Sequence, residues 1–165
     1  MKLKHMLGIL ALFLLIACTP KEEESEKLLS SGIQYIGNQE KIVAELEKLE
    51  IEFENPSTIN IDLKESNLII IEPNYIDKIT RDDLIHALKN GFYVFFINME
   101  DNHILQEKYL NTITYNQRKQ DKIWTEQLYL DNQQLKTIEF SIEPNWENEL
   151  LKWLQYFDKH KEDSK

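Results

Sequence analysis

Two short polar segments hold the residue types that could carry out chemistry in this chain of 165 residues. Each segment directly follows an apolar run. The residues that could contact a ligand or a partner are Glu72, Asn74, Tyr75, Asn98, Glu100, Asp101 and His103. Carboxylates beside a histidine can coordinate a divalent cation or act in acid–base catalysis. Solvated loops have the same composition, so a plain loop and a simple ligand or partner contact stay open as interpretations.

A strand–helix–strand unit at residues 68–97 is expected to position both segments. The runs 68–71 and 92–97 are apolar throughout, as in strands buried on both faces of a parallel sheet. Between them, Thr80 and Asp83 have the spacing of a capping box, and Gly91 falls where a helix C-terminal cap is expected. A right-handed crossover brings the carboxyl ends of the two strands to one edge of the sheet, where ligands of open α/β sheets bind.

Shorter elements are predicted on the N-terminal side of this unit. A strand at 33–36 ends at Gly37, and Asn38 is a candidate cap for a helix that begins near residue 40. An extended piece follows at 51–53, and Ile59 with Ile61 suggests another short strand. Gly37 and Asn38 therefore also belong to the predicted carboxyl edge.

The C-terminal third is predicted to add a short helix, a hairpin and a final helix. The short helix lies around residues 105–110. Two alternating strands flank the polar turn 131–134, which is typical of an antiparallel hairpin at a sheet edge. Trp146, Leu150, Trp153, Leu154 and Phe157 share one face of the last helix. Core packing of its two tryptophans is favoured over an exposed binding platform, whereas Trp124 in the hairpin leaves both interpretations open.

These elements indicate an α/β fold. We expect a three-layer sandwich with a mostly parallel central sheet, an antiparallel hairpin near the C-terminus and a C-terminal helix. The element order resembles the flavodoxin-like architecture. Residues 68–98 are also similar to a segment of class I glutamine-amidotransferase-like domains, in which a strand ending near a proline is followed by a helix, a glycine and a second apolar strand. That family needs a cysteine on a tight turn, and residues 98–101 contain none, so the resemblance implies a non-catalytic member.

The first residues of the chain predict export and lipid anchoring. Basic residues precede an apolar run at 6–16, which is shorter than the roughly 20 residues of a membrane span and suits a signal peptide. The run ends in Leu15-Ile16-Ala17-Cys18, which resembles the lipobox of bacterial lipoproteins. The resemblance implies cleavage between Ala17 and Cys18, a diacylglyceryl group on the Cys18 sulfur, and a location on the cell membrane facing outside the cytoplasm. An uncleaved signal anchor is the alternative, and a host with one membrane or two fits equally.

Composition narrows the chemistry of the remaining chain. Cys18 is the only cysteine, so the folded part has no disulfide and no thiol nucleophile. The three glycines after Cys18 form no phosphate-binding run, and no metal motif is present, so no cofactor and no metal are expected. The net charge of −10 disfavours nucleic acid as a partner. Two of the lysines lie in the removed segment, so the mature chain is still more acidic.

The chain therefore divides into a signal at 1–17, a lipidated cysteine with an acidic tether at 18–30, one α/β domain at 31–160 and a polar tail at 161–165. The favoured function is a membrane-anchored, non-enzymatic domain that binds a protein or envelope component. The alternative is an envelope hydrolase that uses the carboxylates and the histidine at the strand ends. A third interpretation, a small-ligand receptor, lacks the usual cleft between two lobes.

Overall fold

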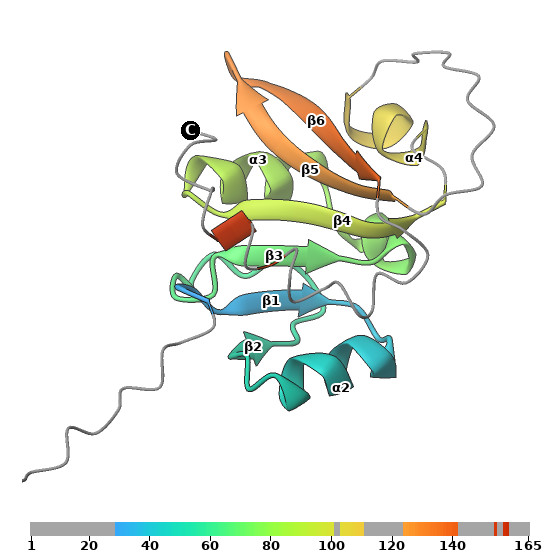
Figure 1. The fold of residues 1–165 in the computed structure, drawn as a ribbon. Helices are drawn as coiled ribbons and strands as arrows, with labels where there is room; N and C mark the ends of the chain where they lie inside the picture. The colour runs from blue at the N-terminus through green and yellow to red at the C-terminus, as the bar shows by residue number, and fades with distance from the viewer. Residues whose placement is uncertain (1–28, 101–102, 111–123, 142–153, 155–156, 159–165) are drawn as a thin grey trace, which may run out of the picture.

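The computed structural model of the chain has a six-stranded sheet in the order β2-β1-β3-β4-β5-β6 (Figure 1). It describes residues 29–100, 103–110, 124–141, 154 and 157–158. The predicted signal, Cys18, residues 19–28 of the predicted tether, Trp146, Trp153 and the tail lie outside this set. The last two residues of the predicted tether lie inside it: Leu29 is buried, and the Ser30 N–H donates to Asp158 Oδ2 at 2.9 Å. The α/β class with a mostly parallel sheet and a C-terminal antiparallel hairpin, as predicted from the sequence, is confirmed.

Four strands form the parallel half of the sheet. They are β1 (Ile33–Ile36), β2 (Phe53–Glu54), β3 (Leu68–Ile71) and β4 (Tyr93–Met99). β1 lies between β2 and β3, and β3 pairs with β4 in the register Leu68↔Tyr93 to Ile71↔Phe96. Every residue of β1 and β3 is buried, because both faces of the sheet are covered.

The predicted strand–helix–strand unit is confirmed at the centre of the sheet. Between β3 and β4 lie the 3-10 helix η1 (Pro73–Lys78) and the helix α3 (Arg81–Lys89). The capping box is present, because the Asp83 N–H donates to Thr80 Oγ1 at 3.1 Å and the Thr80 N–H donates to Asp83 Oδ2 at 2.9 Å. Gly91 follows the helix with φ +84°, a left-handed conformation that glycine adopts without steric cost.

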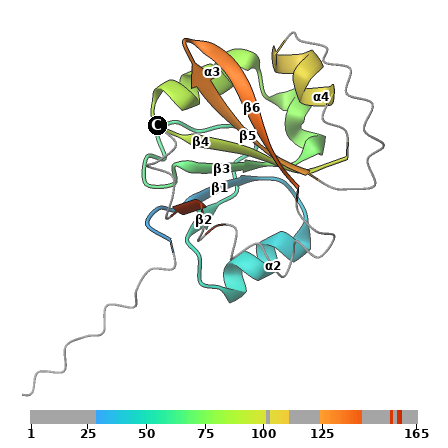
Figure 2. The same ribbon diagram turned by 45° about the horizontal axis from the view of Figure 1, so that its top comes forward.

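The predicted hairpin is confirmed as β5 (Trp124–Asp131) and β6 (Gln134–Ser141). β5 pairs antiparallel with both β4 and β6, so β6 is the outermost strand on this side, as the turned view shows (Figure 2). The two turn residues, Asn132 and Gln133, have φ values of 49° and 65°. Positive φ at both positions is the geometry of the tight turns whose twist matches that of a hairpin.

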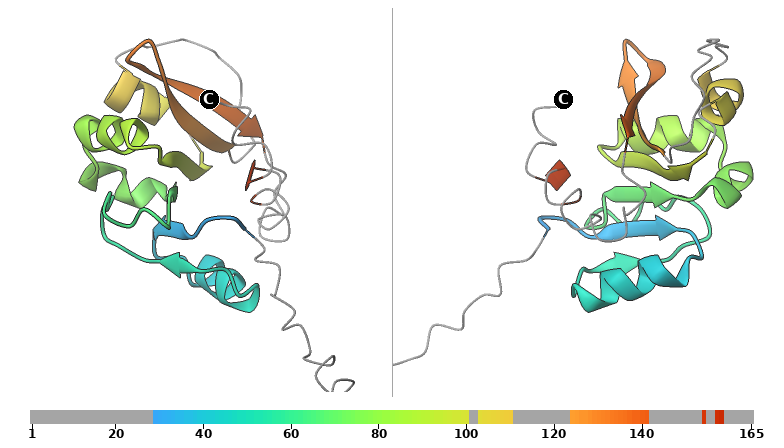
Figure 3. Two further views of the ribbon diagram at one scale, coloured as in Figure 1. Left: turned by 90° about the vertical axis from the view of Figure 1, so that its left-hand side faces the viewer. Right: turned by 45° about the vertical axis from the view of Figure 1, so that its right-hand side comes forward.

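Two clusters of buried apolar side chains cover the two faces of the sheet, since alternate residues of one strand enter different clusters. On one face lie η1, α3 and the helical segment of α4 (His103–Leu105) and η2 (Gln106–Leu110), which confirms the helix expected there. On the other lie α2 (Glu40–Lys48), Leu154 and Phe157. In the left view of Figure 3, α3 and α4 lie on one side of the strands and residues 157–158 lie on the other.

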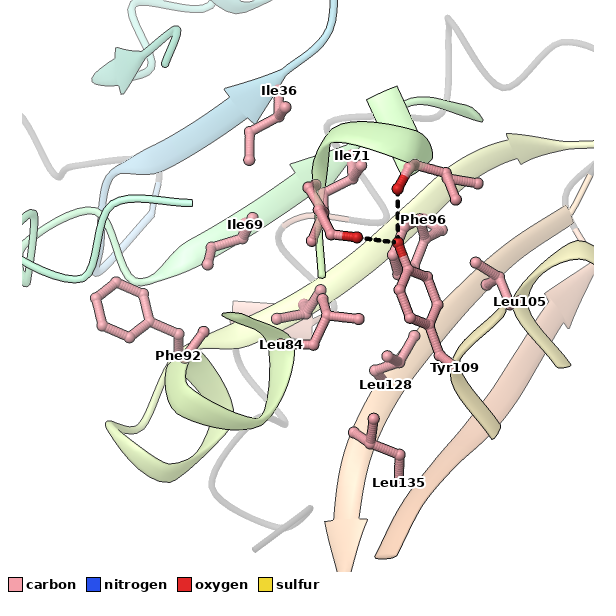
Figure 4. Packing of buried hydrophobic residues seen from close by; sticks show 14 of the residues in the cluster. Ile36, Ile69, Ile71, Leu84, Phe92, Phe96, Leu105, Tyr109, Leu128 and Leu135 are labelled. Carbon is pink, nitrogen blue, oxygen red and sulfur yellow. Dashed lines mark hydrogen bonds between the residues drawn. The ribbon is translucent and has the colours of Figure 1, made fainter. Parts of the chain in front are cut away.

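Tyr109 links the helical segment 103–110 to the loop that follows β3. Its hydroxyl lies 2.9 Å from the carbonyl oxygen of Ile76 and 3.1 Å from that of Ile79, within the apolar cluster (Figure 4). Lys108 Nζ also donates to the Ile76 carbonyl, and Arg81 Nε donates to the Tyr109 carbonyl. A buried tyrosine hydroxyl needs such a partner. Here one is the carbonyl of Ile76 in η1, which also accepts the N–H of Ile79 at 3.2 Å, and the other is the carbonyl of Ile79, directly after η1.

The short strand expected at Ile59 and Ile61 is wrong. The backbone of the intervening Asn60 is held instead by the side chain of Gln34, which is buried in β1. Gln34 Nε2 donates to the Asn60 carbonyl at 2.8 Å, and the Asn60 N–H donates to Gln34 Oε1 at 3.0 Å. The side-chain amide of Gln34 thus binds both the N–H and the carbonyl of Asn60, as a neighbouring strand would.

Candidate functional site at the carboxyl edge of the parallel strands

The loop between β1 and α2 lies where the sheet order reverses. From β1 the chain passes through α2 to β2 on one side, and then returns to β3 on the other side. This reversal is the topological switch point at which open α/β sheets bind their ligands. Gly37, Asn38 and Gln39 form the loop, and we name them the switch loop.

Glu72 lies at the end of β3, next to the switch loop, and its side chain is 0% exposed. Its Oε1 accepts a hydrogen bond from the hydroxyl of Tyr35, which is buried in β1. Its Oε2 accepts the backbone N–H of Asn38 at 3.2 Å. Both carboxylate oxygens are therefore engaged by the chain itself, as a buried carboxylate requires.

Tyr35 joins Glu72 to the start of α2. Its hydroxyl oxygen accepts the backbone N–H of Gln39, the N-cap residue, at 3.1 Å while its proton is directed at Glu72. Burial, and next the hydrogen bond to Glu72, raise the pKa of Tyr35 well above its usual range. The phenol therefore remains a protonated donor in the native domain at any ordinary pH.

The expectation that Asn38 caps the following helix is wrong. The N-cap is Gln39, and its side chain makes no capping hydrogen bond. Asn38 instead lies in the switch loop with its N–H on Glu72. The N–H of Gln39 is bound by a side chain of the preceding strand, so the loop is fixed from β1 and β3 rather than from within.

Gly37 is needed because the Tyr35–Glu72 pair packs directly over its backbone. A Cβ added at residue 37 would lie 2.5 Å from Tyr35 Cζ, 2.6 Å from Tyr35 Oη and 2.7 Å from Glu72 Cδ. These contacts are shorter than any side chain tolerates. Glycine here allows a close approach, not an unusual φ.

Two further side chains reach the switch loop from β2 and β4. Asn55, directly after β2, donates from Nδ2 to the Gly37 carbonyl at 3.3 Å. Asn98, in β4, donates from Nδ2 to Gln39 Oε1 at 3.3 Å. Asn98 has φ 55° where the register between β4 and β5 shifts, a conformation that asparagine tolerates better than most residues. With Glu72 after β3, the other three parallel strands thus each contribute one polar side chain to the loop.

The other residues that the sequence singled out are more exposed than Glu72. Asn74 is exposed in η1, and Tyr75 is half-buried beneath Lys78, whose Nζ lies 4.2 Å from the ring centre. Glu100 is exposed directly after β4, and His103 is half-buried at the start of α4. Asp101 lies outside the described residues. Within the described part of the chain, no group of three or more His, Cys, Asp or Glu residues is arranged to hold a metal ion.

Sequence reasoning did not identify Tyr35, Gln39 and Asn55 as members of this edge. Tyr35 carried one usable signal: a tyrosine in a strand that must be buried needs a partner for its hydroxyl. Glu126 in β5 was also missed, and it is 1% exposed. Its place among alternating apolar residues of the hairpin predicts an inward side chain.

No family model matches the sequence, and comparisons with curated proteins and with solved structures found no match either. Among the described residues, no helix is long and apolar enough to cross a membrane.

Proposed function

We propose that the protein is a lipoprotein anchored outside the cytoplasm through Cys18, and that its α/β domain is a non-enzymatic module that binds a protein partner. The sequence Leu15-Ile16-Ala17-Cys18 supports the anchor. Two acyl chains on one residue supply the two membrane signals that stable anchoring needs. The acidic residues that follow favour a solvated tether between membrane and domain.

The observation that carries the binding function is the outer edge of β6. In a hairpin with a two-residue turn, the pair that closes the turn, here Asp131↔Gln134, is hydrogen-bonded. Along the ladder, hydrogen-bonded pairs then alternate with pairs whose backbone groups point away from the partner strand. The backbone groups of Leu135 and Thr137 therefore point away from β5. Within the described part of the chain, β5 is the one strand that pairs with β6. Such an edge can pair with an extended segment of another protein.

Ile138 adds an apolar contact beside this edge. It is 45% exposed, one of two large apolar residues that the structure describes as exposed. It projects from the face opposite to Leu135, which is buried. A partner strand along β6 would cover Ile138 while its backbone pairs with Leu135 and Thr137.

We also propose the finer architecture, a three-layer sandwich of the flavodoxin-like type. The order β2-β1-β3-β4 in the parallel half, and apolar clusters on both faces, support it. The final strand position of that architecture is here occupied by an antiparallel strand, β5.

The anchor is tested with Cys18→Ala. In cells, we expect the unchanged chain to carry lipid mass and to fractionate with the membrane, and the variant to lose both. Equal masses and equal partitioning would overturn the lipoprotein assignment.

The binding surface is tested by photo-crosslinking in intact cells with the full lipidated chain. A crosslinker at Ile138 is expected to capture a defined partner, whereas one at the exposed Asp62, in the loop before β3, is not. Thr137→Pro removes an outward N–H without breaking the β5–β6 ladder and is expected to abolish the capture. Identical products at both positions, or capture that survives Thr137→Pro, would contradict the proposal. A hydrolase activity that Glu100→Gln abolishes would favour the alternative function instead.

A further inference from the structure

The switch loop lies at the place in the fold that usually receives an anionic ligand. In open α/β sheets, the anionic group of a ligand commonly binds beside the switch point, where backbone N–H groups at the start of a helix point outward. Here the corresponding helix is α2, and the N–H groups that precede it belong to Asn38 and Gln39.

Both N–H groups are already used inside the protein. Asn38 donates to Glu72 Oε2 at 3.2 Å, and Gln39 donates to Tyr35 Oη at 3.1 Å. The Tyr35 hydroxyl in turn donates to Glu72 Oε1. These three hydrogen bonds form one closed network. Each of its donors, the N–H groups of Asn38 and Gln39 and the Tyr35 hydroxyl, has one acceptor.

We infer that Glu72 is an internal anion that fills the ligand position at the β1–β3 switch point. A carboxylate with two accepting oxygens and full burial reproduces what a bound carboxylate or phosphate would offer. The space is also filled, since a single Cβ at Gly37 would come within 2.7 Å of Glu72 Cδ. This edge is therefore closed to anionic ligands, and it holds the start of α2 against β3.

The polar side chains around the loop fit this role. Asn55 and Asn98 bind the Gly37 carbonyl and the Gln39 side chain, so β2, β3 and β4 each contribute one hydrogen bond to the same loop. Hydrogen bonds from three separate strands favour one fixed loop conformation. The inference is independent of the proposed binding at β6, and it places recognition away from the carboxyl edge.

Chemical rescue tests the inference. Glu72→Ala removes the internal anion and leaves the Tyr35 hydroxyl and the Asn38 N–H as two converging donors. We expect its melting temperature to fall by about 5–15 °C. Sodium formate, whose two oxygens can accept from both donors, is expected to recover a measurable part of that loss relative to sodium chloride at equal ionic strength. Glu100→Ala, at the exposed carboxylate after β4, is the matched control and is expected to melt like the unchanged chain in both salts.

Two results would overturn the inference. One is a folded Glu72→Ala variant that formate does not stabilise. The other is an unchanged chain that formate or inorganic phosphate stabilises saturably at millimolar concentration, because an occupied site leaves no room for a second anion, whereas the general salt effect of phosphate does not saturate in this range. If Glu72→Ala does not fold, amide hydrogen exchange of the unchanged chain decides: protection of the Asn38 and Gln39 amides supports the inference, and free exchange refutes it.

Discussion

The hydroxyl of Tyr35 in β1 donates a hydrogen bond to the carboxylate of Glu72, which lies 37 residues later at the end of β3. The two strands are parallel neighbours, with Ile36 opposite Ile71. Glu72 continues this pairing, since its N–H donates to the Ile36 carbonyl at 3.0 Å. The side chains meet because the β1–β3 register places the carboxyl ends of the two strands side by side. The Tyr35 hydroxyl also binds the N–H of Gln39, which fixes the start of α2.

Tyr35→Phe is expected to destabilise the domain although it keeps the ring. The change leaves the N–H of Gln39 without its acceptor and removes one donor from the buried Glu72. We expect the free energy of unfolding to fall by about 1–3 kcal/mol, as measured by urea denaturation. The control is Tyr75→Phe, since Tyr75 is half-buried and no hydrogen bond joins its hydroxyl to the described residues. An equal loss in both variants would contradict a special role for Tyr35.

Gly37→Ala is expected to destabilise by steric overlap. The added methyl would overlap Tyr35 and Glu72, and crowding of this kind costs about 1–3 kcal/mol. Because the overlap is mainly with the Tyr35 ring, combining the change with Tyr35→Ala should cost less than the sum of the two single changes. Strict additivity in a double-mutant cycle measured by urea denaturation would show that the ring is not the obstacle.

Tyr109→Phe is expected to loosen the helical segment 103–110. The change leaves the ring in the apolar cluster but removes the donor that serves the Ile76 and Ile79 carbonyls. We expect a loss of about 1–2 kcal/mol in unfolding free energy and faster amide exchange in this segment. Tyr129→Phe in β5, which is half-buried, is the control. Unchanged exchange at residues 103–110 would argue that packing alone holds the segment.

A spectroscopic titration should detect the raised pKa values of Tyr35 and Tyr109. Burial and the hydrogen bond to Glu72 raise the pKa of Tyr35, and burial with the charges of Asp77 and Asp83 raises that of Tyr109. Free tyrosine ionises near pH 10, so both groups contribute their full stabilisation below about pH 10. Above it the unfolded chain loses these protons while the native domain keeps them, so stability decreases with rising pH. Absorbance at alkaline pH, compared with that of the Tyr35→Phe and Tyr109→Phe variants, should show that these two tyrosines ionise only as the domain unfolds. Ionisation of either one in the folded domain would contradict this assignment.

The elements that the sequence predicted well are those with a strong local pattern. The apolar runs of β3 and β4 had to be covered on both faces, and the Thr80–Asp83 capping box marked the start of α3 within a few residues. The alternating strands of the hairpin, with a polar turn between them, showed β5 and β6 equally clearly. The alternating pattern wrongly predicted a strand at Ile59 and Ile61. The backbone between them is bound by the side chain of Gln34 in β1 instead of by another strand.

The candidate site was predicted in part. The crossover rule brought Glu72, Asn98 and Gly37 to one edge of the sheet, because parallel strands end on the same side. The same rule could not indicate that Glu72 turns inward while Glu100 remains exposed. That difference depends on Tyr35, which offers a buried donor beside β3. The side chain of Glu100 extends into solvent at the end of β4.

The sequence by itself determined the α/β class, the central strand–helix–strand unit, the edge hairpin and the absence of any cysteine after Cys18. It also carries the prediction of a lipid anchor at Cys18. The tertiary structure alone decided the partners of the buried polar groups: Glu72 with Tyr35, Gln34 with Asn60, and Tyr109 with the Ile76 and Ile79 carbonyls. Hydrophobic periodicity is a local property that a sequence displays directly. A hydrogen bond between distant residues requires strand order, register and side-chain direction together, and these are settled only when the whole sheet is assembled.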